Sequence, residues 1–317
     1  MKNILVFPCG SEIALEIYRA LNHSVHFKLF GASSTHSHGE YVFENYIHGV
    51  PFMDDENFID AINEVIDKYK IDFIFPAQDG VLLKLAQNRD KLHAEVITSD
   101  TRVCEISRSK FKTYQELKGV IPVPKMYSID NIDKYPVFLK PDVGSAGKGC
   151  VIANNGDEVQ NAIKHNNSLL ILEYLPGPEY TIDCFSDFNG NLIYVQGRQR
   201  DRILNGMSAH STPINKPEFL DYAKKISEKF RFNGVWFFQV KERANGELVI
   251  MEMSPRVAGT MALSRMCGVN LPLLACFNAQ KLPTFALCND YHVEIDRALE
   301  NKFKIDLEYN SRQHRHP

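Results

Sequence analysis

The order of secondary-structure patterns along the chain constrains its fold more than any other feature. Residues 1 to about 100 alternate short apolar runs with amphipathic stretches, beginning with "ILVF" (4–7) and "SEIALEIYRALN" (11–22). Strands that alternate with helices are typical of a parallel sheet covered by helices on both faces. After the segment "IPVPK" (121–125), the pattern changes to apolar runs joined by turns, which predicts antiparallel sheets. We therefore expect an α/β unit followed by an α+β unit.

Two polar stretches follow strands of the predicted parallel sheet. They are "PCGSE" (8–12) and "PAQDG" (76–80). Ligands of such sheets bind at the carboxyl ends of the strands, so both stretches are candidates for a site. The plainer interpretation, which we prefer at this point, is that Ser11 and Asp79 cap the helices that follow. Further along, residues 101 to about 120 are predicted to be helical around Lys110.

Composition excludes several classes of function. The chain has 317 residues and a net charge of −3, which argues against a nucleic-acid or anionic-membrane partner. No apolar run is long enough to span a bilayer, and the first residues predict a strand and a helix, not a secretion signal. The seven cysteines are scattered without a C-x-x-C pair, which is typical of reduced, structural thiols. We expect a cytoplasmic protein that acts on small molecules.

The stretch "PVFLKPDVGSAGKGCVIA" (136–153) places a lysine at the end of a strand and then a loop rich in glycine. Glycines let backbone N–H groups approach an anion, so such a loop can bind phosphate. Two familiar motifs do not fit: Cys150 stands where the P-loop has lysine, and Ile152 stands where the dinucleotide fingerprint has its last glycine. Taken alone, the loop is equally well explained as a flexible hairpin connection.

An Asn-Gly pair at 245–246, between two apolar runs, predicts a hairpin with a two-residue turn. Its register places Gln239 opposite Glu252 and Phe237 opposite Ser254. Opposed residues share a face, with Cβ atoms about 5 Å apart. A carboxylate beside an amide oxygen is suited to Mg²⁺ that also binds substrate phosphates. The alternative is a plain Gln–Glu hydrogen bond on a solvated face.

A second hairpin is predicted to turn at Asn-Gly 189–190, which places Glu179 opposite Arg200 unless a bulge changes the register. The stretch "RQRDRILNGMSAH" (198–210) contributes Arg198, Arg200 and Arg202, and these could bind a carboxylate substrate bidentately. The alternative is that at least one of them pairs with a neighbouring acid such as Asp201.

Four motifs in one order resemble the ATP-grasp superfamily, in the form that carries a pre-ATP-grasp domain in front, like the large subunit of carbamoyl phosphate synthase. They are "SKFKTYQEL" (109–117), "FLKPDVGSAGKG" (138–149), "ILEYLPGPEYTID" (171–183) and "MEMSPRVAGT" (251–260). The resemblance covers residues 1 to about 285. It implies a Rossmann-like parallel sheet over 1–103 and a two-lobed ATP-grasp fold over 104–288, with a lid at about 121–174, a large lobe at about 175–288 and a tail at 289–317.

The resemblance also assigns roles. The glycine-rich loop would fold over the ATP phosphates, Lys110 and Lys140 would contact them, residues 173–175 would bind adenine, and Glu179 would bind the ribose. The nucleotide-binding positions implied in this way are Lys110, Lys140, Gly144, Ser145, Gly147, Lys148, Glu173, Tyr174, Leu175 and Glu179. The implied catalytic residues are Arg256, which would contact the transferred phosphoryl group, and Lys140; we add Arg200.

Gln239 and Glu252 fall on the metal-ligand positions of the family, in agreement with the hairpin register. The family commonly has Asn-Pro-Arg where this chain has Ser254-Pro255-Arg256. A serine hydroxyl reaches less far than an asparagine amide, so we expect Ser254 to bind the metal directly or through water.

The function implied is an ATP- and Mg²⁺-dependent (or Mn²⁺-dependent) ligase that activates a carboxylate as an acyl phosphate and joins it to an amine or a thiol. Two alternatives stay open. One is a phosphotransferase that acts on a carboxylate or carbamate, and the other is a non-catalytic nucleotide-binding regulator. The expected partners are small-molecule carboxylate and amine substrates, with no nucleic acid and no membrane, and a homodimer is allowed.

Overall fold

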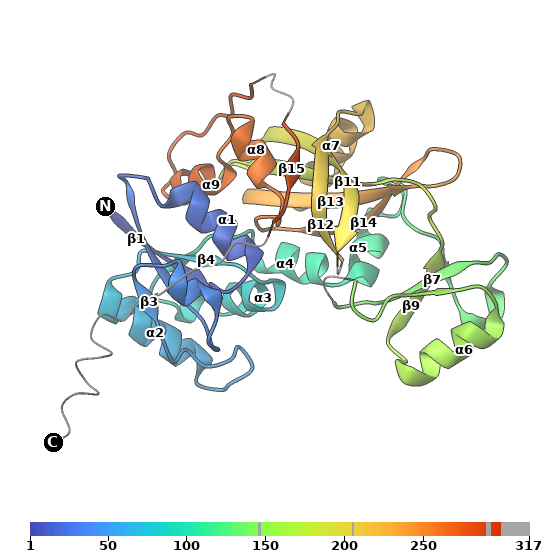
Figure 1. Ribbon diagram of the computed structural model, residues 1–317, viewed down its shortest axis with the longest axis horizontal. Helices are drawn as coiled ribbons and strands as arrows, with labels where there is room; N and C mark the ends of the chain where they lie inside the picture. Colours follow the sequence, from blue (N-terminus) through green and yellow to red (C-terminus); the bar gives the residue numbers. More distant parts are fainter. Residues whose placement is uncertain (145–146, 205, 290–292, 299–317) are drawn as a thin grey trace.

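The computed structural model describes residues 1–144, 147–204, 206–289 and 293–298. Within these residues the strands form three sheets (Figure 1). A parallel sheet built from the first hundred residues lies at one end of the molecule, and a small antiparallel sheet lies at the other. A six-stranded antiparallel sheet lies between them.

The parallel sheet has the order β3-β2-β1-β4-β5, and each neighbouring pair is parallel. Its strands are β1 (Lys2–Phe7), β2 (Phe27–Ala32), β3 (Tyr46–Ile47), β4 (Phe73–Pro76) and β5 (Glu95–Val96). The helices of this unit are α1 (Glu12–Leu21), η1 (His38–Tyr41), α2 (Phe58–Tyr69), α3 (Asp79–Gln87) and η2 (Arg89–Lys91). The predicted α/β pattern is confirmed. The order reverses between β1 and β4, so a crevice opens at the carboxyl ends of these two strands.

Both faces of this sheet are buried. Ile4 and Val6 of β1 pack in a cluster with α1, whereas Leu5 and Phe7 pack in a second cluster with α2 and α3. Successive side chains of a strand point to opposite faces, so a continuous apolar run is what a doubly covered strand requires.

The predicted helix over 101–120 is in fact two helices, α4 (Thr101–Arg108) and α5 (Lys110–Leu117). The break falls at Ser109, which has extended backbone and accepts a hydrogen bond from the Lys112 N–H at 3.1 Å. Ser109 is therefore the N-cap of α5, a position that serine favours because its oxygen satisfies a free N–H.

The small antiparallel sheet has the order β6-β9-β7-β8. Its elements are β6 (Met126–Tyr127), η3 (Ile129–Asn131), β7 (Val137–Pro141), β8 (Val151–Ala153), α6 (Gly156–His165) and β9 (Leu169–Glu173). The glycine-rich loop is the connection between β7 and β8, at the edge of this sheet.

The six-stranded sheet has the order β14-β13-β10-β11-β12-β15, and all its pairs are antiparallel. Its strands are β10 (Glu179–Ser186), β11 (Leu192–Leu204), β12 (Met207–Pro213), β13 (Gly234–Glu242), β14 (Leu248–Ser254) and β15 (Ile295–Asp296). Its helices are α7 (Pro217–Phe230), α8 (Ala262–Met266) and α9 (Leu271–Ala279). The expected tail over 289–317 thus contributes an edge strand at 295–296, and its last residues lie outside the described part.

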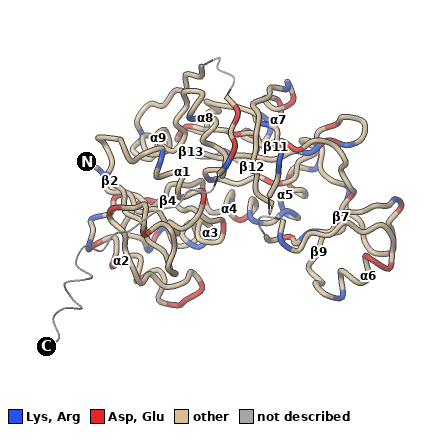
Figure 2. Tube along the Cα trace, viewed as in Figure 1, with Lys and Arg blue, Asp and Glu red and all other residues tan. Residues whose placement is uncertain are grey.

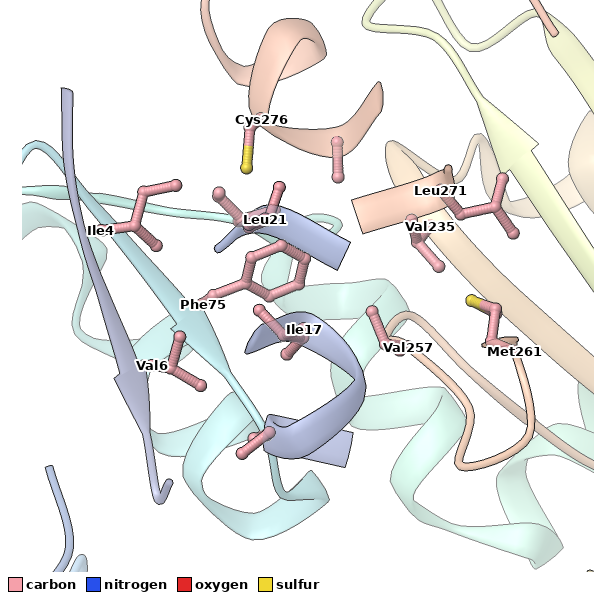
Figure 3. Packing of buried hydrophobic residues seen from close by; sticks show 14 of the residues in the cluster. Ile4, Val6, Ile17, Leu21, Phe75, Val235, Val257, Met261, Leu271 and Cys276 are labelled. Carbon is pink, nitrogen blue, oxygen red and sulfur yellow. The ribbon is translucent and has the colours of Figure 1, made fainter. Parts of the chain in front are cut away.

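One apolar cluster joins the parallel sheet to the six-stranded sheet. Figure 3 shows the Phe75 ring beside Ile17 and Leu21 of α1, with Val235, Val257 and Leu271 of the same cluster next to them. Because a shared core of this kind is packed as densely as the inside of a domain, it fixes how the two sheets face each other.

Charge is dispersed over the molecule. Figure 2 shows acidic and basic residues interspersed along the whole trace, in keeping with the small net charge of −3. No helix in the described residues is both long and apolar enough to cross a membrane.

Candidate functional site

The glycine-rich loop between β7 and β8 is tied to the start of α5. The Asp142 carboxylate accepts hydrogen bonds from the Ser109 hydroxyl at 2.8 and 2.9 Å and from the Phe111 N–H at 2.7 Å. The Asp142 carbonyl accepts from the Lys110 ammonium at 3.2 Å. The loop and the first predicted phosphate-binding lysine are therefore held together.

Within the loop, Gly147 and Gly149 have positive φ angles of 64° and 75°. Such backbone favours glycine, because a side chain is strained there. Gly147 and Lys148 are exposed, and Gly144 is half-buried. The predicted residue Ser145 lies outside the described residues.

Lys140, at the end of β7, is buried with 4% of its surface exposed. Its ammonium donates to the Met251 carbonyl at 3.1 Å and lies 5.4 Å from the centroid of the Tyr114 ring. Burial lowers the pKa of Lys140 to about 8, against the opposing influence of the Glu252 carboxylate, while Lys110 lowers it further. The two predicted lysines are thus close enough to repel each other.

The β13–β14 hairpin places Gln239 opposite Glu252 and Phe237 opposite Ser254, as predicted. The predicted two-residue turn is wrong, because Arg243 pairs with Glu247 and three residues lie between them. The longer turn would shift the register by one residue.

A β-bulge restores the predicted register beside the site. Gln239 pairs with Glu252 but Val240 pairs with Ile250, so Met251 is the extra residue. Its carbonyl accepts from the Tyr114 hydroxyl at 2.8 Å as well as from Lys140. The bulge thus connects the hairpin to α5 and to β7.

The oxygen atoms of Gln239 and Glu252 form a donor set that fits Mg²⁺. Glu252 is half-buried, and no hydrogen bond or ion pair joins its carboxylate to another described residue. The Gln239 amide oxygen accepts from Arg200 Nη1 at 3.0 Å. Mg²⁺ is usually bound through one or two carboxylates together with substrate phosphates, which matches so sparse a set. The described residues contain no cluster of three His, Cys, Asp or Glu side chains suited to a metal.

Ser254 is engaged by a residue of the parallel-sheet unit. Its hydroxyl donates to Asp79 Oδ1 at 2.9 Å. Arg256 contacts the same carboxylate bidentately, with Nε 2.6 Å from Oδ1 and Nη2 2.9 Å from Oδ2. The Arg256 guanidinium also lies 5.1 Å from the centroid of the Phe237 ring. The interpretation of Asp79 as a helix cap is therefore wrong, whereas Ser11 does cap α1 by accepting from the Ala14 N–H at 3.1 Å.

Burial raises the pKa of Asp79, but the charge and hydrogen bonds of Arg256 and Ser254 outweigh it and hold that pKa at about 2. The carboxylate is consequently ionised at neutral pH and balances the charge of Arg256.

Each arginine of the 198–202 stretch has an acidic partner, and none of these partners is Asp201. Buried Arg198 pairs with Asp183, Arg200 pairs with Glu179 across the predicted register, and Arg202 contacts Asp296 at 2.6 Å. Asp201 accepts instead from Gln199 and Thr212. The pairing alternative is therefore the correct one for all three arginines. The second-hairpin register is confirmed from Tyr180 to Phe185, and a bulge follows near the turn.

The predicted adenine-binding segment begins where β9 ends. The Glu173 carboxylate is held by Arg243, at 2.5 to 3.2 Å, and by the Lys125 N–H at 2.8 Å. Tyr174 is 37% exposed and Leu175 is buried. No backbone hydrogen bond joins Tyr174 or Leu175 to another described residue, so their polar groups are available to a ligand.

Two adjoining cavities bring the predicted residues together. The smaller, of about 180 Å³, is lined by the glycine-rich loop and Lys140. The larger, of about 280 Å³, is lined by residues of both polar stretches after β1 and β4, including Ser11 and Asp79, and by Arg256. Residues shared by both cavities are Lys110, Gly144, Arg200, Gly206, Gln239 and Glu252. Glu179 lines the smaller cavity, whereas Glu173 and Tyr174 line neither of the two.

Comparison with known proteins agrees with this arrangement. The family described as "ATP-grasp in the biosynthetic pathway with Ter operon" matches residues 165–298. The carbamoyl phosphate synthase large chain of Clostridium beijerinckii is 28% identical over 231 residues, which are 62% of this chain and 21% of that protein. Residues 165–298 therefore match an ATP-grasp family, and the chain is related in sequence to a carbamoyl phosphate synthase large chain. It spans about a fifth of the length of that synthase relative.

Solved ATP-grasp structures share the fold over most of the chain. The biotin carboxylase domain of the Hydrogenobacter thermophilus 2-oxoglutarate carboxylase, solved with MgADP and bicarbonate, has a TM-score of 0.74 at 17% identity, covering 91% of this chain and 71% of that one. An ADP complex of purK, an N5-carboxyaminoimidazole ribonucleotide synthetase, has a TM-score of 0.73 at 18% identity, covering 92% of this chain and 78% of that one. At these identities the likeness concerns the ATP-grasp fold alone.

Asp79, Tyr114, Met251 and Arg297 contribute to the site but were not assigned to it from the sequence. Asp79 had a usable signal, since it follows a strand at the predicted crevice. Tyr114 and Met251 had none, because their contacts cross between elements far apart in the chain. Arg297 lines the larger cavity from the segment that was expected to be a tail.

We predict that Asp79→Asn destabilises the fold, because it leaves Arg256 largely buried without its counter-charge. The free energy of unfolding should fall by about 3 kcal/mol, as when one partner of a buried pair is removed. The measurement is chemical denaturation at neutral pH. Asp221→Asn, which breaks the exposed pair with Lys225, is the control and should cost about 0.5 kcal/mol or less.

The pH dependence of the difference in unfolding free energy between the wild type and Asp79→Asn is a sharper check. The folded-state pKa of Asp79 is about 2 and the ordinary value is 3.8, so the ion pair stabilises the fold above pH 3.8 and this stabilisation is lost as the pH falls towards 2. The gap between the wild type and Asp79→Asn should narrow in this window. A constant gap would contradict the assignment.

We also predict that the affinity for ATP decreases above about pH 8. The ammonium of Lys140 loses its proton there, and a neutral amine no longer attracts phosphate. The decrease should approach tenfold per pH unit until the pKa of the bound form is reached. Calorimetric titration at several pH values measures it. Lys140→Arg, which stays charged, should lack this decrease, and a flat wild-type profile would remove Lys140 from the phosphate site.

Proposed function

We propose that the protein is an ATP- and Mg²⁺-dependent ligase that activates a carboxylate as an acyl phosphate and joins it to an amine or a thiol. The observation that carries the proposal is the junction of the two cavities, where Lys110, Gln239 and Glu252 meet beside the glycine-rich loop. One cavity has the features of a nucleotide site, and the other has room for the group that accepts the phosphoryl. In this reading the parallel sheet over 1–103 is the pre-ATP-grasp domain and residues 104–288 form the ATP-grasp domain.

The nucleotide would be bound between the two antiparallel sheets. The free backbone groups of Tyr174 and Leu175 would read the adenine edge, and Glu179 would accept from the ribose hydroxyls. Lys110 and Lys140 would bind the phosphates, together with N–H groups of the described loop residues Gly144, Gly147 and Lys148.

Mg²⁺ bound by the oxygens of Gln239 and Glu252 would neutralise charge on the phosphoryl group that is transferred. Ser254 is assigned a supporting part, because its hydroxyl proton is committed to Asp79. A water molecule would be needed to extend its reach to a metal.

Arg256 would complete the phosphoryl clamp. Three of its five N–H groups donate hydrogen bonds within the protein, two to Asp79 and one to the Val257 carbonyl at 3.0 Å. One N–H on each terminal nitrogen stays available at the cavity wall. Because Asp79 fixes the plane of the guanidinium, these donors are oriented before a ligand arrives, and preorganised donors stabilise developing charge at little reorganisation cost.

The reaction balances without any oxidant or reductant. A carboxylate oxygen attacks the γ-phosphorus, the bond to the bridging β–γ oxygen breaks, and ADP leaves. The amine nitrogen then attacks the acyl carbon, phosphate leaves with the carboxyl oxygen, and the nitrogen loses a proton. Exclusion of water from the cavity would protect the acyl phosphate from hydrolysis.

Carbamoyl-phosphate-like chemistry is the second candidate, and the likeness to synthase large chains favours it. There the phosphoryl acceptor would be a carboxylate or carbamate, and no amide would form. A screen of carboxylates with and without amines for ADP release separates the two candidates. A ligase should need both substrates for full turnover, whereas a phosphotransferase should need only the acid.

We predict that Glu252→Gln abolishes Mg²⁺-dependent ADP release, by about a hundredfold or more, while the nucleotide itself still binds. The amide keeps the shape of the side chain but loses the charge that holds the metal. Coupled ADP assay and calorimetry measure the two effects, with the surface variant Lys225→Ala as control. Turnover near the wild-type rate would exclude Glu252 as a metal ligand.

We predict that the nucleotide product is ADP, and that a substrate carboxylate labelled with ¹⁸O transfers one label into inorganic phosphate. Lys110, Lys140 and Glu252 line the smaller cavity and Arg256 lines the adjoining larger one, an arrangement that favours attack at the γ-phosphorus where the cavities join. Mass spectrometry of the released phosphate provides the measurement. AMP and pyrophosphate as products, or phosphate without label, would rule out the mechanism.

A further inference from the structure

The larger cavity contains two guanidinium groups, those of Arg108 and Arg297, that no acid of the described residues meets at hydrogen-bonding distance. Arg108 lies at the glycine-rich loop, where it donates to the Gly144 carbonyl at 3.5 Å. Arg198, Arg200 and Arg256 line this cavity, and each forms an ion pair at hydrogen-bonding distance. Arg297 also lines it, but the nearest carboxylate oxygen, Oε2 of Glu12, lies 3.9 Å away. The guanidinium is held by the Gly259 carbonyl instead.

Electrostatics agree with this contact pattern. Burial lowers the pKa of Arg297, with Arg198 and Arg19 adding to the effect and Glu12 opposing it. Arg265 shows the opposite effect, because its ion pair with Glu16 raises its pKa. A partly buried guanidinium without a full counter-charge favours binding of an anionic ligand, because the ligand supplies the missing negative charge.

The backbone of the C-terminal segment holds Arg297 in place. β15 pairs with β12, and the Arg297 N–H donates to the Ala209 carbonyl at 2.9 Å. The preceding Asp296 faces outward, where Arg202 and His210 contact it. Successive side chains of a strand point to opposite faces, so anchoring Asp296 outside directs Arg297 into the cavity.

Arg297 lines the larger cavity but not the smaller one, which contains Lys140, Gly147 and Lys148. Lys110 and Glu252 line both cavities, so the reacting carboxylate is expected where the cavities join, and we assign to Arg297 a different anionic group. Glu12 contributes the opposite charge 3.9 Å from Arg297. The complementary ligand carries an ammonium group next to an anionic group.

We propose that Arg297 and Glu12 recognise the amine substrate, and that this substrate carries an acidic group, carboxylate or phosphate, close to its amine. Calling this ligand a substrate rests on the proposed ligase function, whereas the site itself rests on the contacts above. Arg297 would bind the acidic group through paired N–H donors, and Glu12 would bind the ammonium before it loses its proton.

The test measures binding and does not depend on turnover. Calorimetry first establishes MgADP binding to the wild type and to Arg297→Gln, which should be equal because Arg297 lies outside the smaller cavity. Thermal shift is then recorded in saturating MgADP with amino acids and phosphoethanolamine as probes. Amino-acid amides and ethanolamine are their neutral counterparts. We expect at least one anionic probe to stabilise the wild type well beyond its neutral counterpart.

Two variants and a control make the assignment specific. Arg297→Gln should weaken binding of that probe by roughly 10- to 100-fold, as for loss of a charged hydrogen-bonding partner. In Gly259→Ala the added Cβ would meet Arg297 Nη2 at 2.9 Å, so the side chain must move and affinity should fall although the charge is kept. Arg102→Gln, at an arginine whose side chain is 63% exposed, should leave the affinity unchanged.

The outcomes separate this inference from the proposed function. Equal stabilisation by anionic and neutral probes, or unchanged affinity in Arg297→Gln, would overturn the inference while MgADP binding still supports the ligase. Arg297-dependent binding of an anionic amine without MgADP binding would support the site and overturn the ligase. A preference for amino acids or for phosphoethanolamine identifies which acidic group the site takes.

Discussion

The ion pair between Asp79 and Arg256 links the parallel sheet to the hairpin on which the candidate metal ligands lie. Arg256 lies two residues after the end of β14 and is largely buried against Phe237, so it requires a counter-charge. Asp79 supplies that charge from the first turn of α3, at the crevice of the parallel sheet. The same carboxylate accepts from Ser254. The geometry at the end of β14 therefore depends on docking of the two units, which their shared apolar core maintains.

The bulge at Met251 has a comparable role on the other side of the hairpin. Its carbonyl is freed from the strand ladder and accepts from both Tyr114 and Lys140. Lys140 is thereby held at the base of the glycine-rich loop, although burial makes its charge costly and lowers its pKa. A regular hairpin would turn this carbonyl to a neighbouring strand, and the lysine would lose its partner. The irregularity is thus part of how the small antiparallel sheet and α5 meet the six-stranded sheet.

Local patterns predicted the parallel sheet, the two hairpins and the pairing of Gln239 with Glu252. The pairing was right although the turn was wrong, because the extra turn residue and the bulge compensate each other. Contacts between distant segments were harder to predict: Asp79 was taken for a cap, and the acidic partners of Arg198 and Arg202 were not identified, although the hairpin register did place Glu179 opposite Arg200. Periodicity reports which face of an element is buried, but it does not report which acid a buried arginine meets. The roles in nucleotide and metal binding were inferred from the resemblance and stay predictions.

The balance of charge around the cavities shows where a ligand would be complementary. Arg198, Arg200 and Arg256 are each matched by a carboxylate, so they contribute shape and hydrogen-bond donors more than net charge. Among the described residues, Lys110 and Lys140 donate hydrogen bonds to carbonyl oxygens and form no ion pair, and no hydrogen bond or ion pair joins Glu252 to another side chain. Unbalanced positive charge beside the loop and unbalanced negative charge on the hairpin are what phosphates and a divalent cation, respectively, would neutralise. Folding pairs Arg198, Arg200 and Arg256 with acids but leaves these charges unpaired, which is the physical basis for proposing that the nucleotide binds there.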